Sequence, residues 1–119
     1  MKSNNTKASV LNGFLRIISR ISDKSYQERV WIRGEGPEFD DFTETVCFFF
    51  EIGDYILSDY KSYGITTQQY AHLKEFRDIF EQFSDQQSWA PEFIDSPEWA
   101  QIMERAKEVL KAFNYQKKT

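Results

Sequence analysis

The stretch RGEGPEFDDFTETVCFFFEIGDYILSDYK, residues 33–61, joins a dense hydrophobic segment to a block of negative charge. Two glycines and a proline near its start favour a loop. The apolar residues that follow repeat at helical spacing, which predicts a helix over about residues 40–60. Asp40 or Asp41 is a suitable N-cap, and Glu44 falls in the first turn, where the helix dipole favours an acid.

A helical wheel divides this predicted helix into three sectors. The broad apolar sector contains Phe42, Val46, Phe49, Phe50, Gly53, Ile56, Leu57 and Tyr60. A second apolar sector beside it contains Phe48, Ile52 and Tyr55. The remaining sector is acidic and contains Asp40, Glu44, Glu51 and Asp54. We therefore expect a central helix that is packed on two sides and exposes almost only carboxylates on the third.

Charge is distributed unevenly along the chain. Residues 34–60 carry eight acids and no base, whereas residues 1–33 carry seven bases and two acids, and the whole chain has a net charge of −4. Contacts with phosphates need cations, so the acidic block argues against nucleic acid as the main ligand. It favours a basic protein partner, a bound metal ion, or a solvated face without a function.

Helical spacing predicts three further main helices, over about residues 8–23, 66–83 and 96–113. The last two begin on residues that favour N-caps: Thr66 or Thr67, and Ser96. Short connections between four main helices predict an antiparallel bundle, so we expect one all-α domain over residues 1–119, with short extra helical turns. The predicted core includes Phe42, Val46, Phe49, Phe50, Leu57, Leu73, Phe80, Trp99 and Leu110. Residues 1–7 and 115–119 are predicted to fray.

Metal and catalytic chemistry find little support in the sequence. His72 and Glu75 have the spacing H-x-x-E, with Asp78 one turn further on. Di-iron sites in bundles use paired E-x-x-H motifs from two helices, whereas this chain has one histidine, in the opposite order. No nucleophile elbow or phosphate-binding loop is present. We therefore expect no metal, no cofactor and no enzymatic activity.

The compartment is also predicted from the sequence. Arg16 and Arg20 interrupt the first apolar segment, so it does not resemble a signal peptide, and no apolar run approaches the length of a membrane span. Cys47 is the single cysteine, which fits a reducing compartment, and its apolar surroundings predict a buried, inert thiol. We expect a cytoplasmic protein without a membrane partner.

The segments WIRGEGPEFDDFTETVCFFFEIGDYI and YGITTQQYAHLKEFRDIFEQF, with the chain's size and acidity, resemble the small acidic immunity proteins of bacterial polymorphic toxin systems. The resemblance covers most of the chain and is strongest to the proteins of contact-dependent growth inhibition. The tyrosine-pair motif of the colicin-nuclease immunity proteins is absent. The resemblance implies a cytosolic, non-enzymatic protein that binds a toxin domain, often a basic nuclease, and blocks its active site or substrate cleft.

The acidic block is the predicted partner-binding site. Its candidate residues are Glu35, Glu38, Asp40, Asp41, Glu44, Glu51 and Asp54. An acidic surface on a preformed helical scaffold attracts a basic partner quickly. The alternative is a helical adaptor or regulatory protein with another basic partner. Trp89 and Phe93, in the connector before the last helix, either cap the end of the bundle or anchor a partner.

Overall fold

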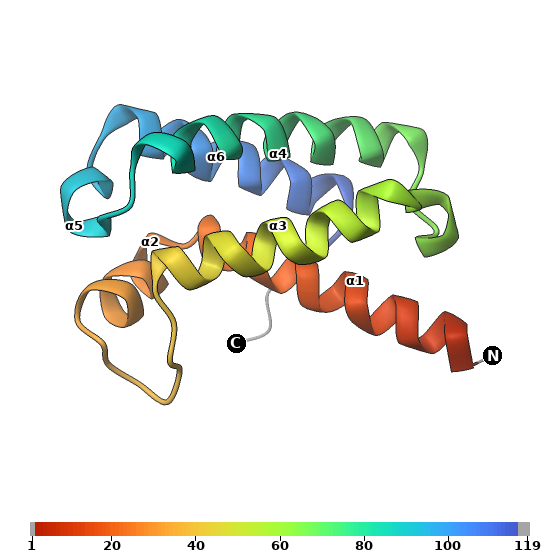
Figure 1. Ribbon diagram of the computed structural model, residues 1–119, viewed down its shortest axis with the longest axis horizontal. Helices are drawn as coiled ribbons and strands as arrows, with labels where there is room; N and C mark the ends of the chain where they lie inside the picture. The colour runs from red at the N-terminus through yellow and green to blue at the C-terminus, as the bar shows by residue number, and fades with distance from the viewer. Residues whose placement is uncertain (1, 117–119) are drawn as a thin grey trace.

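The computed structural model describes residues 2–116, and it describes the side chains from residue 6 onward. Within this range all regular structure is helical, which confirms the all-α prediction (Figure 1). The four long helices are α1 (Lys2–Ile21), α3 (Phe42–Ser58), α4 (Thr67–Gln86) and α6 (Pro97–Ala112). The short elements are α2 (Lys24–Tyr26), the π-helical turn η1 (Gln27–Ile32), the 3₁₀ turn η2 (Tyr60–Tyr63) and α5 (Ala90–Phe93). None of these helices is both long and apolar enough to cross a membrane.

The long helices form two layers. In Figure 1, α4 and α6 lie above α3 and α1. Helix α1 packs against α3 and α6, and α4 packs against α6 and α3. The loop between η1 and α3 lies at the same end of the molecule as α5, on the left of Figure 1. The finer expectation of a regular antiparallel four-helix bundle stays a prediction.

Side chains cap the helices as their sequence predicts. Asp41, Thr66 and Ser96 each accept a hydrogen bond from the backbone N–H three residues further on. The side chain of Gln69 also accepts a hydrogen bond from the backbone N–H of Thr66, which completes a capping box. Gly64 ends η2 with a φ of 75°, a left-handed conformation that favours glycine.

Fraying at the two ends of the chain stays a prediction. Helix α1 begins at Lys2, and it packs against η2, where the Lys7 ammonium lies 5.4 Å from the ring centre of Tyr63. Near the other end, Tyr115 packs against the core. Residue 1 and residues 117–119 lie outside the described residues.

An aromatic cluster around Phe49 forms the centre of the core. The Phe49 ring stacks on Phe14 of α1 at a centroid distance of 5.2 Å. It also meets the edges of Phe76 and Phe80 of α4, at 5.6 and 5.1 Å. Five of the predicted core residues are buried: Phe42, Phe49, Leu73, Phe80 and Trp99. The other four, Val46, Phe50, Leu57 and Leu110, are partly buried and pack against this core.

A buried polar contact joins the end of α1 to α6. The side chain of Gln27 is fully buried, and its amide nitrogen donates to the carbonyl oxygens of Arg20 (3.0 Å) and Ile21 (2.8 Å). Its amide oxygen accepts from the Trp99 indole nitrogen at 2.9 Å. Gln27 thus pairs carbonyl groups at the end of α1, where the helix provides few partners; the Arg20 oxygen also accepts from the Asp23 backbone N–H at 3.2 Å. Gln27 and Trp99 lie 72 positions apart, so local sequence patterns could not predict this contact.

Candidate functional site

Asp40 is part of the folded framework rather than a free surface carboxylate. One of its oxygens accepts hydrogen bonds from the Tyr26 hydroxyl (2.8 Å) and the Trp31 indole nitrogen (3.0 Å). The Thr45 hydroxyl donates to the same carboxylate, and a guanidinium nitrogen of Arg20 lies 3.9 Å away. The Asp40 side chain is only 9% exposed. Burial, followed by the hydrogen bond to Asp40, raises the pKa of Tyr26, so its hydroxyl remains a donor.

Glu38 holds the loop before α3 closed around an arginine. Arg29 donates to its two carboxylate oxygens at 3.0 and 3.2 Å and to the backbone oxygen of Glu35 at 3.3 Å. The loop passes close to this guanidinium at Gly36, which has a φ of 93° and no room for a Cβ atom beside Arg29. The sequence showed no base within the acidic block, but the fold supplies one from the preceding π-helical turn.

Glu38→Gln is expected to reduce the loss of stability in acid. Hydrogen bonds from Arg29 hold the pKa of Glu38 below its ordinary value of 4.5. As the pH falls, the unfolded chain therefore binds a proton at this position before the folded protein does. The stabilisation is complete above the unfolded-state pKa and is lost as the pH falls through the lower folded-state pKa. Urea denaturation at several pH values measures this slope.

Arg29→Gln provides the matched control for this prediction. It removes the same hydrogen bonds from the other side, so it should flatten the acid dependence to a similar extent. If Glu38→Gln keeps the wild-type dependence of stability on pH, the pair does not contribute to the acid response.

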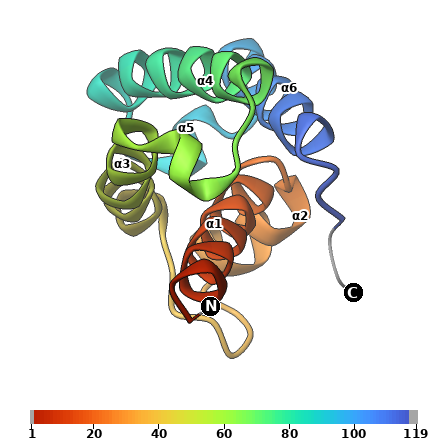
Figure 2. The same ribbon diagram turned by 90° about the vertical axis from the view of Figure 1, so that its right-hand side faces the viewer.

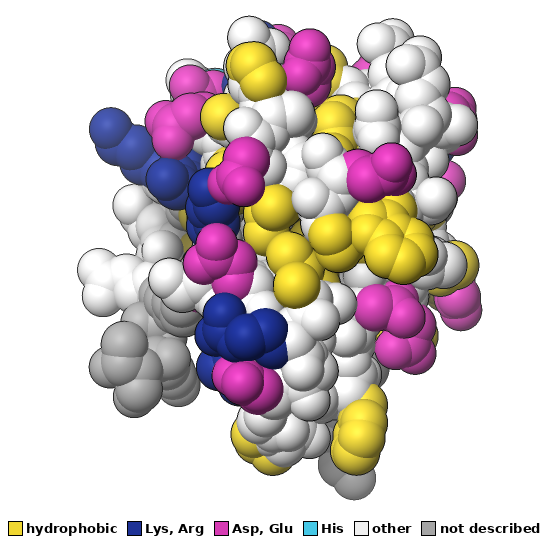
Figure 3. Space-filling view, turned by 90° about the vertical axis from the view of Figure 1, so that its left-hand side faces the viewer, with side chains coloured by type: hydrophobic (Ala, Val, Ile, Leu, Met, Phe, Trp, Pro, Cys, Tyr) yellow, Lys and Arg dark blue, Asp and Glu magenta, His cyan; other side chains and the backbone are white. Residues whose placement is uncertain are grey.

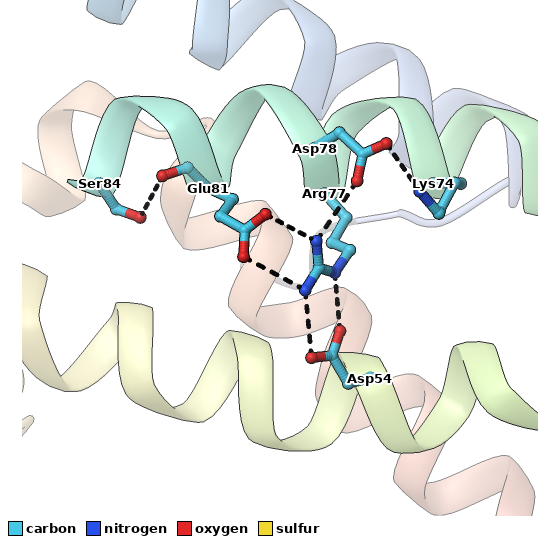
Figure 4. A network of polar contacts seen from close by, with 6 residues as sticks. All are labelled: Asp54, Lys74, Arg77, Asp78, Glu81 and Ser84. Carbon is cyan, nitrogen blue, oxygen red and sulfur yellow. Dashed lines mark hydrogen bonds and ion pairs between the residues drawn. The ribbon is translucent and has the colours of Figure 1, made fainter. Parts of the chain in front are cut away.

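Asp54 is neutralised by a residue from the neighbouring helix. Figure 4 shows Arg77 of α4 between Asp54 of α3 and Glu81. Arg77 donates to the two Asp54 oxygens at 2.7 and 3.2 Å and to Glu81 at 3.1 Å. Its guanidinium carbon lies 5.2 Å from the ring centre of Phe50. The hydrogen bond to Asp54 is the main cause of the raised pKa of Arg77. This arrangement ties α3 to α4.

The other predicted acids divide into two groups. Asp41 caps α3, and Glu35 forms an exposed ion pair with Arg33 at 3.1 Å, which contributes little to stability. The side chains of Glu44 and Glu51 are exposed, and neither forms an ion pair with any residue that the structure describes. Glu44 and Glu51 thus keep the unneutralised charge that the sequence predicted for the whole block. Asp41 also has no ion pair with the described residues, but its side chain is used to cap α3.

Aromatic side chains accompany these two free carboxylates. Glu44, Phe48, Glu51 and Tyr55 follow one another at intervals of three or four residues along α3, so they form one continuous stripe, here called the α3 stripe. Phe48 is 50% exposed and Tyr55 is 72% exposed. The exposed face of α3 is therefore mixed aromatic and acidic.

This arrangement corrects the prediction that α3 is packed on two sides. Phe48 and Tyr55 of the second apolar sector face solvent, and Ile52 is half-buried. Helices α1 and α4 both pack against the broad apolar sector, around Phe49, so they share one side of α3. Cys47 was predicted to be buried, but it is exposed, because it lies on the acidic side of the helix.

The two aromatic residues of the last connector have different environments. Phe93 is buried and packs on Phe42 and Trp99, which makes it part of the core. Trp89 is 61% exposed. Phe39, in the loop before α3, is 96% exposed, and sequence reasoning missed it, although its position between acids in a loop with two glycines was a usable signal. Figure 3 shows hydrophobic side chains among Asp and Glu side chains at this end of the molecule.

The residues considered for a metal site do not come together. His72 is exposed on α4, Glu75 pairs with Arg105, and Asp78 accepts a hydrogen bond from Lys74 at 2.7 Å. In the part of the chain that the structure describes, no three His, Cys, Asp or Glu side chains are placed to hold a metal ion.

Comparisons with protein-family models, with curated proteins and with solved structures give no match.

Proposed function

We propose that this protein is an immunity protein, which binds a basic toxin domain, such as a nuclease, in the bacterial cytoplasm and covers its active site or substrate cleft. The observation that carries the proposal is the α3 stripe, where two unpaired carboxylates alternate with two exposed aromatic rings. Aromatic side chains are frequent anchors in protein interfaces. Unpaired carboxylates complement the arginine and lysine side chains that a nuclease uses to bind phosphates.

The α3 stripe lies on a helix that is held rigidly in the fold, which favours rapid binding. The four residues extend over about 16 Å of one helix, because an α-helix rises about 1.5 Å per residue. The buried Phe49 cluster and the Asp54–Arg77 ion pair fix this helix against α1 and α4. Little conformational entropy would be lost when the stripe meets a partner. The inhibitor would act by occlusion, with Glu44 and Glu51 taking the positions of substrate phosphates.

The proposed site is narrower than the acidic block. Four acids of this block stabilise the fold around the α3 stripe and are not part of the proposed contact surface. Hydrogen bonds fix the loop and the start of α3 at Glu38, Asp40 and Asp41, and an ion pair joins Asp54 to Arg77. Glu35 is exposed and stays a candidate for the rim of the interface.

Charge reversal within the α3 stripe tests this proposal. Glu44→Lys with Glu51→Lys is expected to weaken binding to the cognate toxin domain by about tenfold or more, because each new lysine repels a basic surface. The full chain would be used to capture partners from the native host, with identification by mass spectrometry. Affinity for the captured protein, and protection of cells that express it, would then be measured for each variant.

Glu104→Lys with Glu108→Lys is the matched control. It makes the same change in net charge on α6, where both acids are exposed. Equal weakening by the two double variants would show that net charge alone acts and would overturn the proposed site. A captured partner that is not a toxin, bound through the α3 stripe, would instead favour the adaptor function.

A further inference from the structure

A groove of about 730 Å³ lies between α1, the α2–η1 segment and residues 113–116. Figure 2 shows α1 between α3 on one side and the C-terminal segment on the other, so this groove is separate from the α3 stripe. Its lining includes four arginines and two acids: Arg16, Arg20, Arg29, Arg33, Asp23 and Glu38. Its volume falls within the usual range for small-molecule sites, about 300–1,000 Å³.

Two of these arginines remain available to a ligand. Arg29 and Arg33 are paired with carboxylates of the loop before α3. Arg16 is exposed and forms no ion pair with the residues that the structure describes. Arg20 forms a long ion pair with Asp40, at 3.9 Å, and the Asp40 oxygens already accept shorter hydrogen bonds from three other side chains. Arg16 and Arg20 are four residues apart on α1, so they lie on one face.

The ring of Tyr26 contacts two of the arginines that line the groove. The guanidinium carbons of Arg20 and Arg29 lie 4.9 and 5.7 Å from the ring centre of Tyr26. The Tyr26 hydroxyl donates to Asp40, which holds the ring in place beside the two cations. Such stacking restricts guanidinium groups before any ligand arrives, and the planar donors of arginine match the oxygens of a phosphate. An anion in the groove would also relieve repulsion between these neighbouring cations.

The groove also has apolar and aromatic lining residues. Leu15 of α1, Phe113 and Tyr115 contribute to its lining. The backbone N–H of Tyr115 donates to the Leu110 carbonyl oxygen at 2.9 Å, which fixes the backbone at this position. The groove therefore combines cationic residues with aromatic ones, which matches a molecule that has an anionic group and a flat or apolar body.

We propose that this groove binds a small organic phosphate. The phosphate contacts the guanidinium groups of Arg16 and Arg20, and the ring or apolar body of the ligand packs against Phe113 and Tyr115. This site is independent of the proposed toxin-binding surface. The toxin-binding surface lies on α3, whereas the groove lies beside α1 and uses other residues.

Calorimetric titration of the full chain tests this site with three probes: adenosine monophosphate, inorganic phosphate and adenosine. Adenosine monophosphate is expected to bind more tightly than either of the other two, because it alone engages both the arginines and the aromatic residues of the groove. Arg16→Gln should weaken its binding by about tenfold, since a hydrogen bond between charged groups is lost. Tyr115→Ala should weaken the binding of adenosine monophosphate and leave that of inorganic phosphate unchanged.

Arg105→Gln is the matched control, since Arg105 is an exposed arginine on α6 outside the groove. It should bind adenosine monophosphate like the wild type. Three results would overturn the site: no detectable binding of adenosine monophosphate at millimolar concentration, equal weakening by Arg16→Gln and Arg105→Gln, or equal affinity for adenosine monophosphate and inorganic phosphate. Circular dichroism of each variant checks that the helices are retained.

Discussion

Phe49→Ala is expected to lower the free energy of unfolding by about 3–5 kcal/mol, since it removes a buried ring and leaves a cavity. The Phe49 ring is fully buried and contacts aromatic rings from α1, α3 and α4. These neighbours cannot all move inward to fill the space, because they are held by separate helices. Chemical denaturation followed by circular dichroism measures the change.

Phe48→Ala is the matched control, because it removes the same side chain from the adjacent position. Phe48 is half-exposed, so the change in the free energy of unfolding should be within about 0.5–1 kcal/mol of the wild type. If the two variants lose similar stability, the placement of α3 with Phe49 inward and Phe48 outward is wrong. The same Phe48→Ala variant should weaken partner binding through the α3 stripe.

The second large loss of stability is expected from a substitution at Asp40. Asp40→Ala should lower the free energy of unfolding by about 2–4 kcal/mol, because it removes hydrogen bonds to a charged group and leaves partly buried donors unpaired. The affected donors are the Tyr26 hydroxyl, the Trp31 indole nitrogen and the Thr45 hydroxyl. Thermal and urea denaturation of the variant would measure the loss, and the Trp31 environment can be followed by fluorescence.

Glu51→Ala is the matched control, because Glu51 is an exposed and unpaired acid. The free energy of unfolding of this variant should stay within about 0.5 kcal/mol of the wild type. A loss at Asp40 no larger than the loss at Glu51 would contradict the framework role of Asp40. The two residues also show that the charge of an acid does not by itself place it on a binding surface. Asp40 and Glu51 fall in the same acidic sector of the helical wheel, yet only Glu51 is free.

Part of the candidate site could be predicted from the sequence. The spacing of Glu44 and Glu51 placed both acids on the side of the helix opposite Phe49, and the structure agrees. The role of Asp54 could not be predicted, because its partner Arg77 lies 23 residues further along the chain. A variant that changes Asp54 together with Glu44 and Glu51 would break this ion pair, so the two free acids alone give the cleaner test of binding.

The exposure of Phe48 and Tyr55 also could not be predicted from the local sequence pattern. A wheel shows which residues share a face, but it does not show how many neighbouring helices cover that face. Here α1 and α4 both pack on the broad apolar sector of α3, and the second sector is left partly in solvent. The α3 stripe therefore combines rings that were assigned to the core with acids that were assigned to the surface.

The sequence by itself determined the all-α class, the cap at Ser96, a cap at Thr66 or Thr67, and the inward position of Phe49; the structure has Thr66. These features depend on residues a few positions apart, and hydrogen bonds and periodicity act over that range. The tertiary structure alone decided which acids are neutralised, since Arg29 and Arg77 reach Glu38 and Asp54 only after the helices pack. It also decided which aromatic rings stay exposed and where a cationic groove forms, because burial depends on contacts between segments that are far apart in the chain.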